Sequence, residues 1–304
     1  MQQGIYHVPV MLQQVIVGLK INPSGIYVDC TFGGGGHSKA ILDKLNDRGK
    51  LIAFDQDEEA KKNIPKDARI IFIPQNFRHL NRFLRLHKII QVDGILADLG
   101  VSSYQFDKPE RGFSTRFNAA MDMRMDQRQQ KTAIDILNKY SEEKLHKIFE
   151  QYGEVTNSKT LARTIIQQRK TASLQTIADF KNAVQAIVKG NPNKYFAQIF
   201  QALRIEVNDE LEALKDMLQQ SADVLKEGGR MAVITFHSLE DRIVKNFFKG
   251  QNEAKRDEVY GTQNESPFHL ITKKPIIAGE EEVKLNSRAR SAKLRIAEKK
   301  KFLK

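Results

Sequence analysis

The sequence predicts an α/β protein in which an all-helical domain is inserted into a doubly wound parallel sheet. Apolar, β-branched runs of strand length alternate with amphipathic helical patterns near both ends of the chain. From about residue 132 to residue 225 the apolar spacing is helical only. A helical block between two α/β segments is typical of an insertion. We therefore expect a sheet domain over 1–105 and 206–304, and a helical domain over 106–205.

The stretch from Gly25 to Asp57 is the clearest part of the sheet pattern. A strand-like run, 26–28, leads into the consecutive glycines Gly33–Gly36, and a helical pattern follows them. Residues without a Cβ let a ligand approach the backbone, and they leave the first N–H groups of a helix accessible. A second strand, 51–54, ends at Asp55, from which a carboxylate can reach the hydroxyl pair of a ribose. Together these features predict an adenosine-containing cofactor.

The glycine pattern argues against a dinucleotide as that cofactor. The motif G-x-G-x-x-G would place its third glycine at position 38, after Gly33 and Gly35, but this residue is Ser38. Asp29 precedes the loop and His37 follows it, where a pyrophosphate favours plain N–H groups. S-adenosyl-L-methionine carries no phosphate, so it suits these neighbours better. The structural alternative is a glycine turn that only closes a βα unit.

The remaining elements continue the pattern. We expect further strands at 70–73, 92–98, 230–236, 269–272 and 292–297, with the last two as an antiparallel pair at the sheet edge. We expect a short helix that ends at about 19, and further helices at about 58–63, 83–90, 134–140, 142–152, 158–168, 174–188, 195–225 and 241–248. Phe77 follows the third strand, and Asp98 ends the fourth strand. Phe77 is placed to stack on a base or to pack in its loop, and Asp98 is a second acid at a carboxyl end.

Composition points to a polyanionic partner. The chain has 304 residues, 49 Lys and Arg against 37 Asp and Glu, and a formal charge of +12, which favours nucleic acid over a small acidic metabolite. The alternative is a basic protein with no such partner. Cys30 is the only cysteine, so an internal disulfide and a cysteine-based zinc site are excluded, and we expect no metal. The chain shows no signal-peptide pattern and no run of 18 apolar residues, which predicts a cytoplasmic enzyme without a membrane partner.

The segment 107–130 combines arginines with aromatic residues. Such a mixture suits single-stranded nucleic acid, because bases stack on rings while guanidinium groups pair with phosphates. The residues of this kind are Arg111, Phe113, Arg116, Phe117, Arg124 and Arg128. We take Arg111, Phe113, Arg116 and Arg124 as candidate RNA contacts.

Eight motifs, in order along nearly the whole chain, resemble those of one known family. They are HVPVML at 7–12, DCTFGGGGHS at 29–38, DLGVSS at 98–103, PERGFS at 109–114, MDMRMDQ at 121–127, FQALRIEVNDEL at 200–211, ITFHSLEDR at 234–242 and SRARSAKLR at 287–295. The chain resembles the bacterial small-subunit (16S) ribosomal RNA cytosine-N4 methyltransferase H family. The resemblance implies a class I (Rossmann-like) methyltransferase fold, S-adenosyl-L-methionine as cofactor, and a helical insert that helps to hold RNA. The implied substrate is one cytosine in the decoding region of small-subunit ribosomal RNA.

The resemblance also implies particular cofactor contacts. Carried over by position, they are Gly35, Gly36, His37, Asp55, Phe77, Asp98 and Gln105. Two departures affect this transfer: the chain has Tyr104 where the family usually has proline, and Asn191-Pro-Asn-Lys-Tyr-Phe-Ala-Gln198 where a His-Pro-Ala run is common. We expect the RNA partner in an assembled or nearly assembled subunit, although the sequence does not separate this from naked RNA, and it leaves a homodimer open.

The chemistry gives two candidate catalytic residues. Cytosine's exocyclic amine is a poor nucleophile, so an enzyme must align it, accept its hydrogen bond and remove a proton. The chain has no Pro-Pro pair for this task, and Asp98 occupies the equivalent place after the fourth strand. Its carboxylate suits either the cofactor or the substrate amine. His237, at the end of the fifth strand, is the second candidate, and a structural hydrogen bond is its alternative role.

Two other classes of function compete with a methyltransferase. A non-catalytic RNA-binding assembly factor would share the fold, but it would tolerate an eroded glycine loop or the loss of Asp55, and neither is seen. An NAD-dependent oxidoreductase is disfavoured by the missing third glycine and by the excess positive charge.

Overall fold

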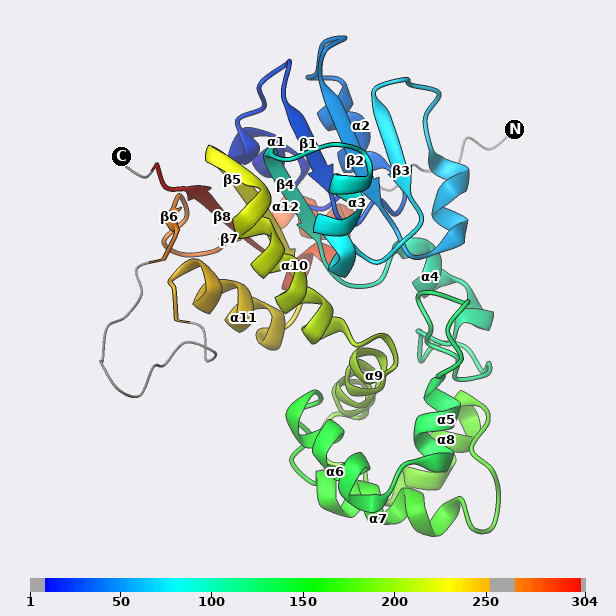
Figure 1. Cartoon of the computed structure of the whole chain (residues 1–304). Coiled ribbons are helices and arrows are strands. Elements are labelled where there is room, and N and C mark those ends of the chain that lie inside the picture. Colours follow the sequence, from blue (N-terminus) through cyan, green and yellow to red (C-terminus); the bar gives the residue numbers. More distant parts are fainter. Residues whose placement is uncertain (1–8, 252–265, 302–304) are drawn as a thin grey trace. The chain divides into compact units, whose positions relative to one another are not determined.

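The computed structural model describes residues 9–251 and 266–301, and the chain in it divides into two compact units (Figure 1). The first, which we call the sheet unit, consists of residues 1–100 and 212–304, and the second, the helical unit, of residues 101–211. The helical unit is thus a few residues longer at each end than the expected 106–205. The predicted motif that begins at His7 lies partly outside the described residues.

The sheet unit is built on one sheet whose first strands are all parallel. Its strands are β1 (Ile26–Asp29), β2 (Lys50–Phe54), β3 (Ile70–Ile73), β4 (Val92–Asp98), β5 (Leu225–Thr235), β6 (Phe268–Leu270), β7 (Ile276–Ile277) and β8 (Lys293–Lys299). The order is β3-β2-β1-β4-β5-β8-β6, with β7 paired to β8. Strands β1 to β5 are parallel, and β8 runs antiparallel to β5, β6 and β7. The order reverses between β1 and β4, which is where such sheets bind ligands.

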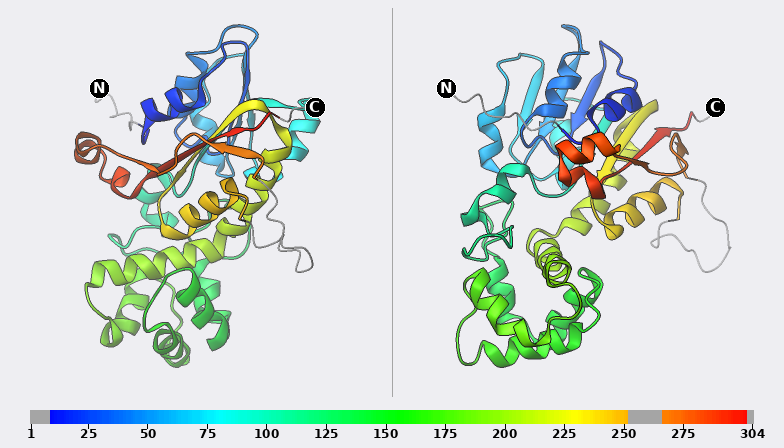
Figure 2. Two further views of the ribbon diagram at one scale, coloured as in Figure 1. Left: turned by 90° about the vertical axis from the view of Figure 1, so that its left-hand side faces the viewer. Right: turned by 180° about the vertical axis from the view of Figure 1, so that it is seen from behind.

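Helices cover both faces of this sheet because alternate residues of the strands point to opposite sides. Val28, Ile52 and Ile95 pack with α3 (Leu80–Leu86), α10 (Glu210–Val224) and α11 (Ser238–Phe248). Their neighbours Tyr27 and Leu51 pack with α1 (Leu12–Leu19) and α2 (Gly36–Leu42) on the other face. Figure 2 shows these two helix layers in two further views, one from the side and one from behind relative to Figure 1. The predicted doubly wound architecture is confirmed.

Short elements complete the sheet unit. They are the 3-10 turns η1 (Glu58–Asn63), η2 (Phe77–His79) and η6 (Ser287–Ser291), and the helix α12 (Glu280–Leu285). The expected antiparallel pair near the C-terminus is present as β6 and β8, although β8 lies inside the sheet, between β5 and β6. No helix among the described residues has both the length and the apolar composition needed to span a membrane.

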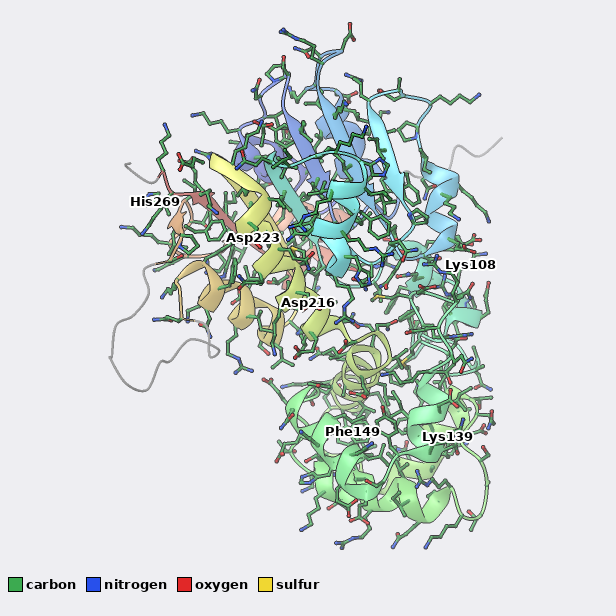
Figure 3. The ribbon with its side chains drawn as sticks, viewed as in Figure 1. Lys108, Lys139, Phe149, Asp216, Asp223 and His269 are labelled. Atoms are coloured by element: carbon green, nitrogen blue, oxygen red, sulfur yellow. The ribbon has the colours of Figure 1, made fainter. Side chains whose placement is uncertain are left out.

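The helical unit has a core of its own. Its elements are α4 (Ser103–Asp107), η3 (Pro109–Arg111), α5 (Ala133–Lys139), α6 (Glu142–Gln151), α7 (Ser158–Gln168), α8 (Ile177–Val184), η4 (Gln185–Ile187) and α9 (Pro192–Asn208). Phe149 is fully buried among apolar side chains from these helices, whereas Lys139 is 75% exposed (Figure 3). Burying one such aromatic side chain stabilises a fold by about 1.5–3 kcal/mol.

Two element boundaries differ from the sequence prediction. The helix expected over 195–225 is broken at Asp209, which adopts a left-handed backbone conformation with φ 52° and ends α9. Strand β5 begins at Leu225, which pairs with Val92, whereas the sequence predicted a helix up to 225 and a strand only from 230. The register of the β4–β5 pair shifts just after Val92, and Gly228, with φ 75°, permits this irregular start.

Candidate active site

The glycine turn between β1 and α2 is open to solvent on one side and closed on the other. A side chain added at Gly34 would meet no atom within 4 Å, whereas one added at Gly36 would lie 2.2 Å from Cγ of Pro9. Gly33 and Gly35 have φ values of 52° and 77°, which glycine adopts without strain. Of the predicted cofactor contacts, Gly35 therefore shapes the turn, and Gly36 lets the N-terminal segment pass close to it.

Asp55 is held by backbone N–H groups directly beside this turn. Its Oδ2 accepts a hydrogen bond from Gly33 at 2.7 Å, and its Oδ1 accepts one from Asp57 at 2.8 Å. Burial raises the pKa of Asp55 to about 6, although these two hydrogen bonds oppose the shift. Each carboxylate oxygen keeps further acceptor capacity. The geometry thus presents a fixed acceptor pair of the kind that a ribose diol requires.

Phe77 lies next to the carboxyl end of β2. It begins η2 directly after Asn76, whose side-chain amide donates to Oε1 of Gln56 at 2.8 Å and whose oxygen accepts from the N–H of Arg78 at 2.9 Å. The Phe77 ring is half-buried against the sheet core. This placement leaves both roles predicted for Phe77, base stacking and loop packing, compatible with the structure.

The ends of β1 and β4 are joined through Thr31. Asp29 is buried, with Oδ2 accepting from Oγ of Ser38 at 2.7 Å and Oδ1 from the N–H of Thr31 at 3.0 Å. Oγ1 of Thr31 in turn accepts from the N–H of Asp98 at 2.7 Å. Sequence reasoning noted Asp29 only as a neighbour of the loop. Its position as the last residue of a buried strand is the signal that marks it as part of the site.

Asp98 lacks a partner for one oxygen in the described part of the chain. Oδ1 is buried without a hydrogen bond there, and Oδ2 lies 3.7 Å from Nδ1 of His37. Burial raises the pKa of Asp98 well above its usual range, and the carboxyl groups of Asp29 and Glu240 raise it further. A carboxyl group with an unsatisfied buried oxygen and a raised pKa is a frequent feature of functional sites.

His37 contacts protein atoms on both sides of its ring. Nε2 lies 3.0 Å from the carbonyl oxygen of Val10, and Nδ1 faces Asp98. Burial lowers the pKa of His37. The side chain of this predicted cofactor contact therefore binds the N-terminal segment.

His237 and Glu240 form a pair at the end of β5. Nε2 of His237 lies 3.1 Å from Oε1 of the buried Glu240, and Oε2 of Glu240 accepts from the N–H of Phe236 at 2.9 Å. This arrangement is a helix start in which a carboxylate reaches back to the chain before it. The structural alternative for His237 thus has a defined geometry, and its catalytic role stays a prediction.

Gln105 belongs to the helical unit and is buried in α4. Its Oε1 accepts from the N–H of Ser102 at 3.0 Å, and its own N–H donates to Oγ of Ser102 at 3.2 Å. These two bonds form a capping box. The predicted cofactor contact Gln105 therefore fixes the start of a helix.

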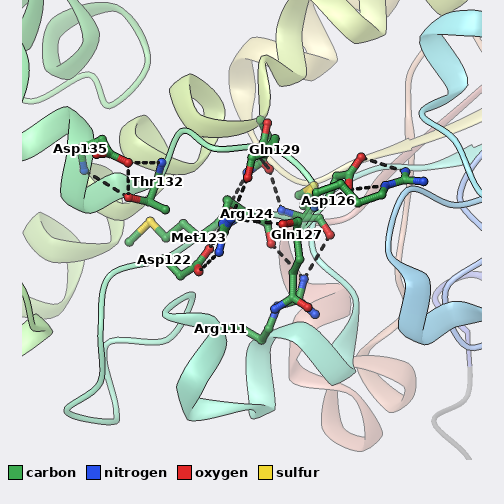
Figure 4. Close-up of polar contacts among 12 residues, drawn as sticks. Arg111, Asp122, Met123, Arg124, Asp126, Gln127, Gln129, Thr132 and Asp135 are labelled. Carbon is green, nitrogen blue, oxygen red and sulfur yellow. Dashed lines mark hydrogen bonds and ion pairs between the residues drawn. The ribbon is translucent and has the colours of Figure 1, made fainter.

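Two of the four candidate RNA contacts are buried in the helical unit. Nη2 of Arg111 donates to the carbonyl oxygens of Arg124 at 2.9 Å and Met125 at 3.1 Å (Figure 4). Arg111 is 3% exposed, and Phe113, at 6%, belongs to the core. Because these side chains offer no surface to a nucleic acid, the sequence prediction for Arg111 and Phe113 is replaced by a structural role.

Arg124 also serves the loop around it. Its guanidinium forms a two-pronged pair with Asp122, at 2.8 Å and 2.7 Å, and donates to the carbonyl oxygen of Gln129 at 2.7 Å (Figure 4). Asn208 of α9 adds two bonds to this loop, from its Nδ2 to the carbonyl of Met123 at 2.8 Å and from the N–H of Met125 to its Oδ1 at 2.7 Å. The arginine-rich segment 107–130 is thus stabilised by hydrogen bonds within the helical unit.

Arg116 remains as an exposed candidate. Its side chain is 59% exposed and pairs with Asp107, itself 54% exposed, at 3.0 Å. The guanidinium also lies 5.2 Å and 5.5 Å from the ring centres of Phe106 and Phe117. Exposed ion pairs of this kind contribute little to stability and exchange readily for other partners.

S-adenosyl-L-methionine fits the sheet-unit residues. Asp55 offers acceptors for two ribose hydroxyls, and the orphaned oxygen of Asp98 suits the positive charge that this cofactor carries. Among the described residues there is no group of three or more His, Cys, Asp or Glu side chains arranged to hold a metal ion. The fold and these carboxylates define an α/β protein that binds an adenosine-containing cofactor at the carboxyl ends of its strands.

Comparison with known proteins gives the family. A model of the MraW methylase family matches residues 4–300. The chain is 52% identical over 297 residues to ribosomal RNA small subunit methyltransferase H of Bacteroides thetaiotaomicron, covering 97% of this chain and 98% of that protein. It is 53% identical over 298 residues to the protein of that name from Flavobacterium johnsoniae, with the same coverage. The chain belongs to the MraW methylase family, and it is accordingly a methyltransferase that uses S-adenosyl-L-methionine.

Proposed function

We propose that this chain methylates the exocyclic N4 amine of a cytosine in the decoding region of small-subunit ribosomal RNA. The observation that carries the proposal is Asp98, whose Oδ1 is a buried acceptor without a partner in the described residues at the carboxyl end of β4. The names of the relatives supply ribosomal RNA as the substrate class. The formal charge of +12 agrees with such a partner.

Methyl transfer to the amine depends more on a hydrogen-bond acceptor beside the nitrogen than on a strong base. The lone pair of the cytosine amine is delocalised, so the nitrogen becomes nucleophilic only as its N–H bond weakens. In our proposal the carboxylate of Asp98 accepts a hydrogen bond from the amine and takes its proton as the N–C bond forms. When bound, S-adenosyl-L-methionine would supply the methyl group from a positively charged sulfonium, whose sulfur–methyl bond breaks as the N–C bond forms, with S-adenosylhomocysteine as the leaving group. Positive charge beside Asp98 favours its ionised form, which opposes the effect of burial.

The other sheet-unit residues bind and orient. Asp55 accepts the ribose hydroxyls, and the open side of the turn at Gly34 leaves room for the ligand. Phe77 lies at the same sheet edge, where its half-buried ring offers an edge or face to adenine. Asp29 and Thr31 fix the main chain that carries Asp98. Holding the reactants in this geometry supplies part of the rate enhancement.

We propose the helical unit, residues 101–211, as the RNA platform. Its exposed cations provide the charge that phosphates require. They are Arg116, Arg128, Lys139, Lys144, Lys147, Lys159, Arg163, Lys170, Lys189 and Lys194. Arg116, whose guanidinium lies near two aromatic rings, is the best candidate for contact with single-stranded RNA.

The proposal is tested by methyl transfer from labelled S-adenosyl-L-methionine to small subunits and, in parallel, to naked RNA of the same sequence. The RNA comes from cells that lack this enzyme. Mass spectrometry of the nucleosides then identifies the product. N4-methylcytidine at one decoding-region position is the expected result, and we predict it in assembled or nearly assembled subunits.

Two results would overturn the proposal. Label on carbon 5 of the base would contradict an exocyclic acceptor, and RNA binding without label would favour the non-catalytic assembly factor. We also predict a cytoplasmic location, where ribosomal RNA is found, and leave a homodimer to sedimentation measurements on the purified chain.

A further inference from the structure

The N-terminal segment Pro9–Met11 crosses the glycine turn as a strap. Pro9 lies so close to Gly36 that any side chain there would clash. The carbonyl oxygen of Val10 lies 3.0 Å from Nε2 of His37. The N–H of Met11 donates to Oε1 of Glu282 on α12 at 2.6 Å, and Met11 is fully buried. Three successive residues of the strap are therefore fixed by two different parts of the sheet unit, the start of α2 and α12.

The strap determines how the ring of His37 is protonated. A carbonyl oxygen only accepts hydrogen bonds, so Nε2 must carry a proton and donate it to Val10. Nδ1 is then the nitrogen that faces Asp98, 3.7 Å from Oδ2. This distance is too long for a hydrogen bond, but a shift of less than about 1 Å by the Asp98 carboxyl group, whose side chain is 23% exposed, brings the two atoms within reach.

We propose that His37 is a positioning residue for methyl transfer, through which the N-terminal strap sets the orientation of Asp98. One proton shared between Nδ1 and Oδ2 satisfies both groups, and it fixes the orientation of the Asp98 carboxyl group. The inference rests on the proposed function for the role of Asp98. It gives the strap and Glu282 a part in the site, which the glycine motif alone does not imply.

The charges around His37 agree with a shared proton. Three carboxyl groups face the ring from different elements: Asp29 from β1, Asp98 from β4 and Glu282 from α12. Burial disfavours a doubly protonated ring, while the carboxylates of Asp29 and Glu282 favour it. Asp98 in turn lies near Asp29 and Glu240, which disfavour its ionised form. These effects bring the proton affinities of His37 and Asp98 closer together. Two groups share a proton when their proton affinities are similar.

The first test needs neither cofactor nor RNA. In the full-length protein with ¹⁵N-labelled histidine, NMR reports which ring nitrogen of His37 carries a proton. We expect Nε2 to be protonated, and we expect the Nδ1 signal to move in Asp98→Asn while it stays in place in the matched variant Asp55→Asn. A proton on Nδ1 with none on Nε2, or an Nδ1 signal that ignores Asp98→Asn, would overturn the inference.

The second test separates positioning from folding. In His37→Gln the amide can still donate to Val10, but nothing replaces Nδ1. We expect kcat to fall about tenfold or more, with KM for S-adenosyl-L-methionine within about twofold, since a displaced group costs rate rather than ground-state binding. Hydrogen exchange at the Met11 amide should match the parent protein. An unchanged kcat, or a loss accompanied by faster Met11 exchange, would contradict the inference.

The two tests distinguish a failure of the inference from a failure of the proposed function. If the protein does not methylate cytosine N4, the NMR measurement still shows whether His37 and Asp98 share a proton. If methylation occurs but the Nδ1 signal ignores Asp98→Asn, only the inference fails.

Discussion

The two units use their charged side chains in opposite ways. At the strand ends of the sheet unit, Asp29, Asp55 and Asp98 meet only N–H groups, hydroxyls and one histidine ring among the described residues, and their pKa values are raised. In the helical unit many acids are paired with cations, and the hydrogen bond from Lys139 lowers the pKa of Asp135 to about 2. Buried acids without a cationic partner are typical of ligand-binding sites. Acids that are paired with a cation are already neutralised within the protein.

The same contrast applies to arginine. Arg111 and Arg124 use their N–H groups to hydrogen-bond the loop that carries them. A cluster that the sequence suggests as a nucleic-acid contact is therefore a structural network. Arg116 differs because its carboxylate partner, Asp107, is about as exposed as Arg116 itself. Exposure and the identity of the partner, rather than residue type, separate a contact residue from a structural one.

The largest effect should come from Asp98→Asn. Because the amide is a poor proton acceptor, we expect kcat for methyl transfer to fall by at least about 100-fold. The matched control is Asp216→Asn, which alters a carboxylate on α10 that is 48% exposed and pairs with Arg78. Full activity in Asp98→Asn, measured with the same RNA, would remove the carboxylate from the reaction.

Replacing Arg111 should destabilise the fold. Arg111→Met leaves two buried carbonyl oxygens without their charged donor, and we expect the free energy of unfolding to fall by about 2–4 kcal/mol. Urea unfolding measures the change, and Arg116→Met on the exposed neighbour should shift it by no more than about 0.5 kcal/mol. If Arg111→Met kept its stability and lost RNA affinity, the RNA role predicted from the sequence would return.

Asp55→Ala should weaken cofactor binding by about 1.5–3 kcal/mol, the range for hydrogen bonds to a charged group. The binding of S-adenosylhomocysteine, followed by calorimetry, should also depend on pH in the parent protein. The pKa of Asp55 is raised to about 6 in the ligand-free fold, and only the ionised form accepts both hydroxyls. Affinity should therefore fall as pH drops below about 6, by up to about tenfold per pH unit. Asp55→Ala should lose this step, and a parent profile that is flat from pH 5 to pH 8 would argue against a ribose contact.

The smallest effect is expected for Arg116→Ala, which tests the helical unit as the RNA platform. Loss of one phosphate contact should lower the slope of log affinity against log salt by somewhat less than about 1. Arg116→Lys keeps the charge and should restore the slope without restoring stacking. Cofactor binding serves as the control and should not change. An unaltered slope in Arg116→Ala would place the RNA contacts elsewhere among the exposed cations.

The sequence by itself determined the sheet and the location of its acids. Strand composition, the glycines before α2, and Asp55 and Asp98 at strand ends are local features, and parallel strands bring their carboxyl ends to one edge whatever the details of packing. The break between α9 and α10 escaped this reasoning, because the apolar spacing continues through Asp209 and only its left-handed backbone reveals the end of the helix.

Only the tertiary structure decided which charged side chains are free. Arg111 is buried because Asn208, 85 residues beyond Met123, ties the arginine-rich loop to α9, and no local pattern records that contact. His37 has its ring orientation for a similar reason, since Val10 and Asp98 reach it from separate elements. The order of residues in the sequence limits which groups can lie at the same edge of the sheet. Contacts with residues far along the chain then decide whether a charged group is already paired or can bind a ligand.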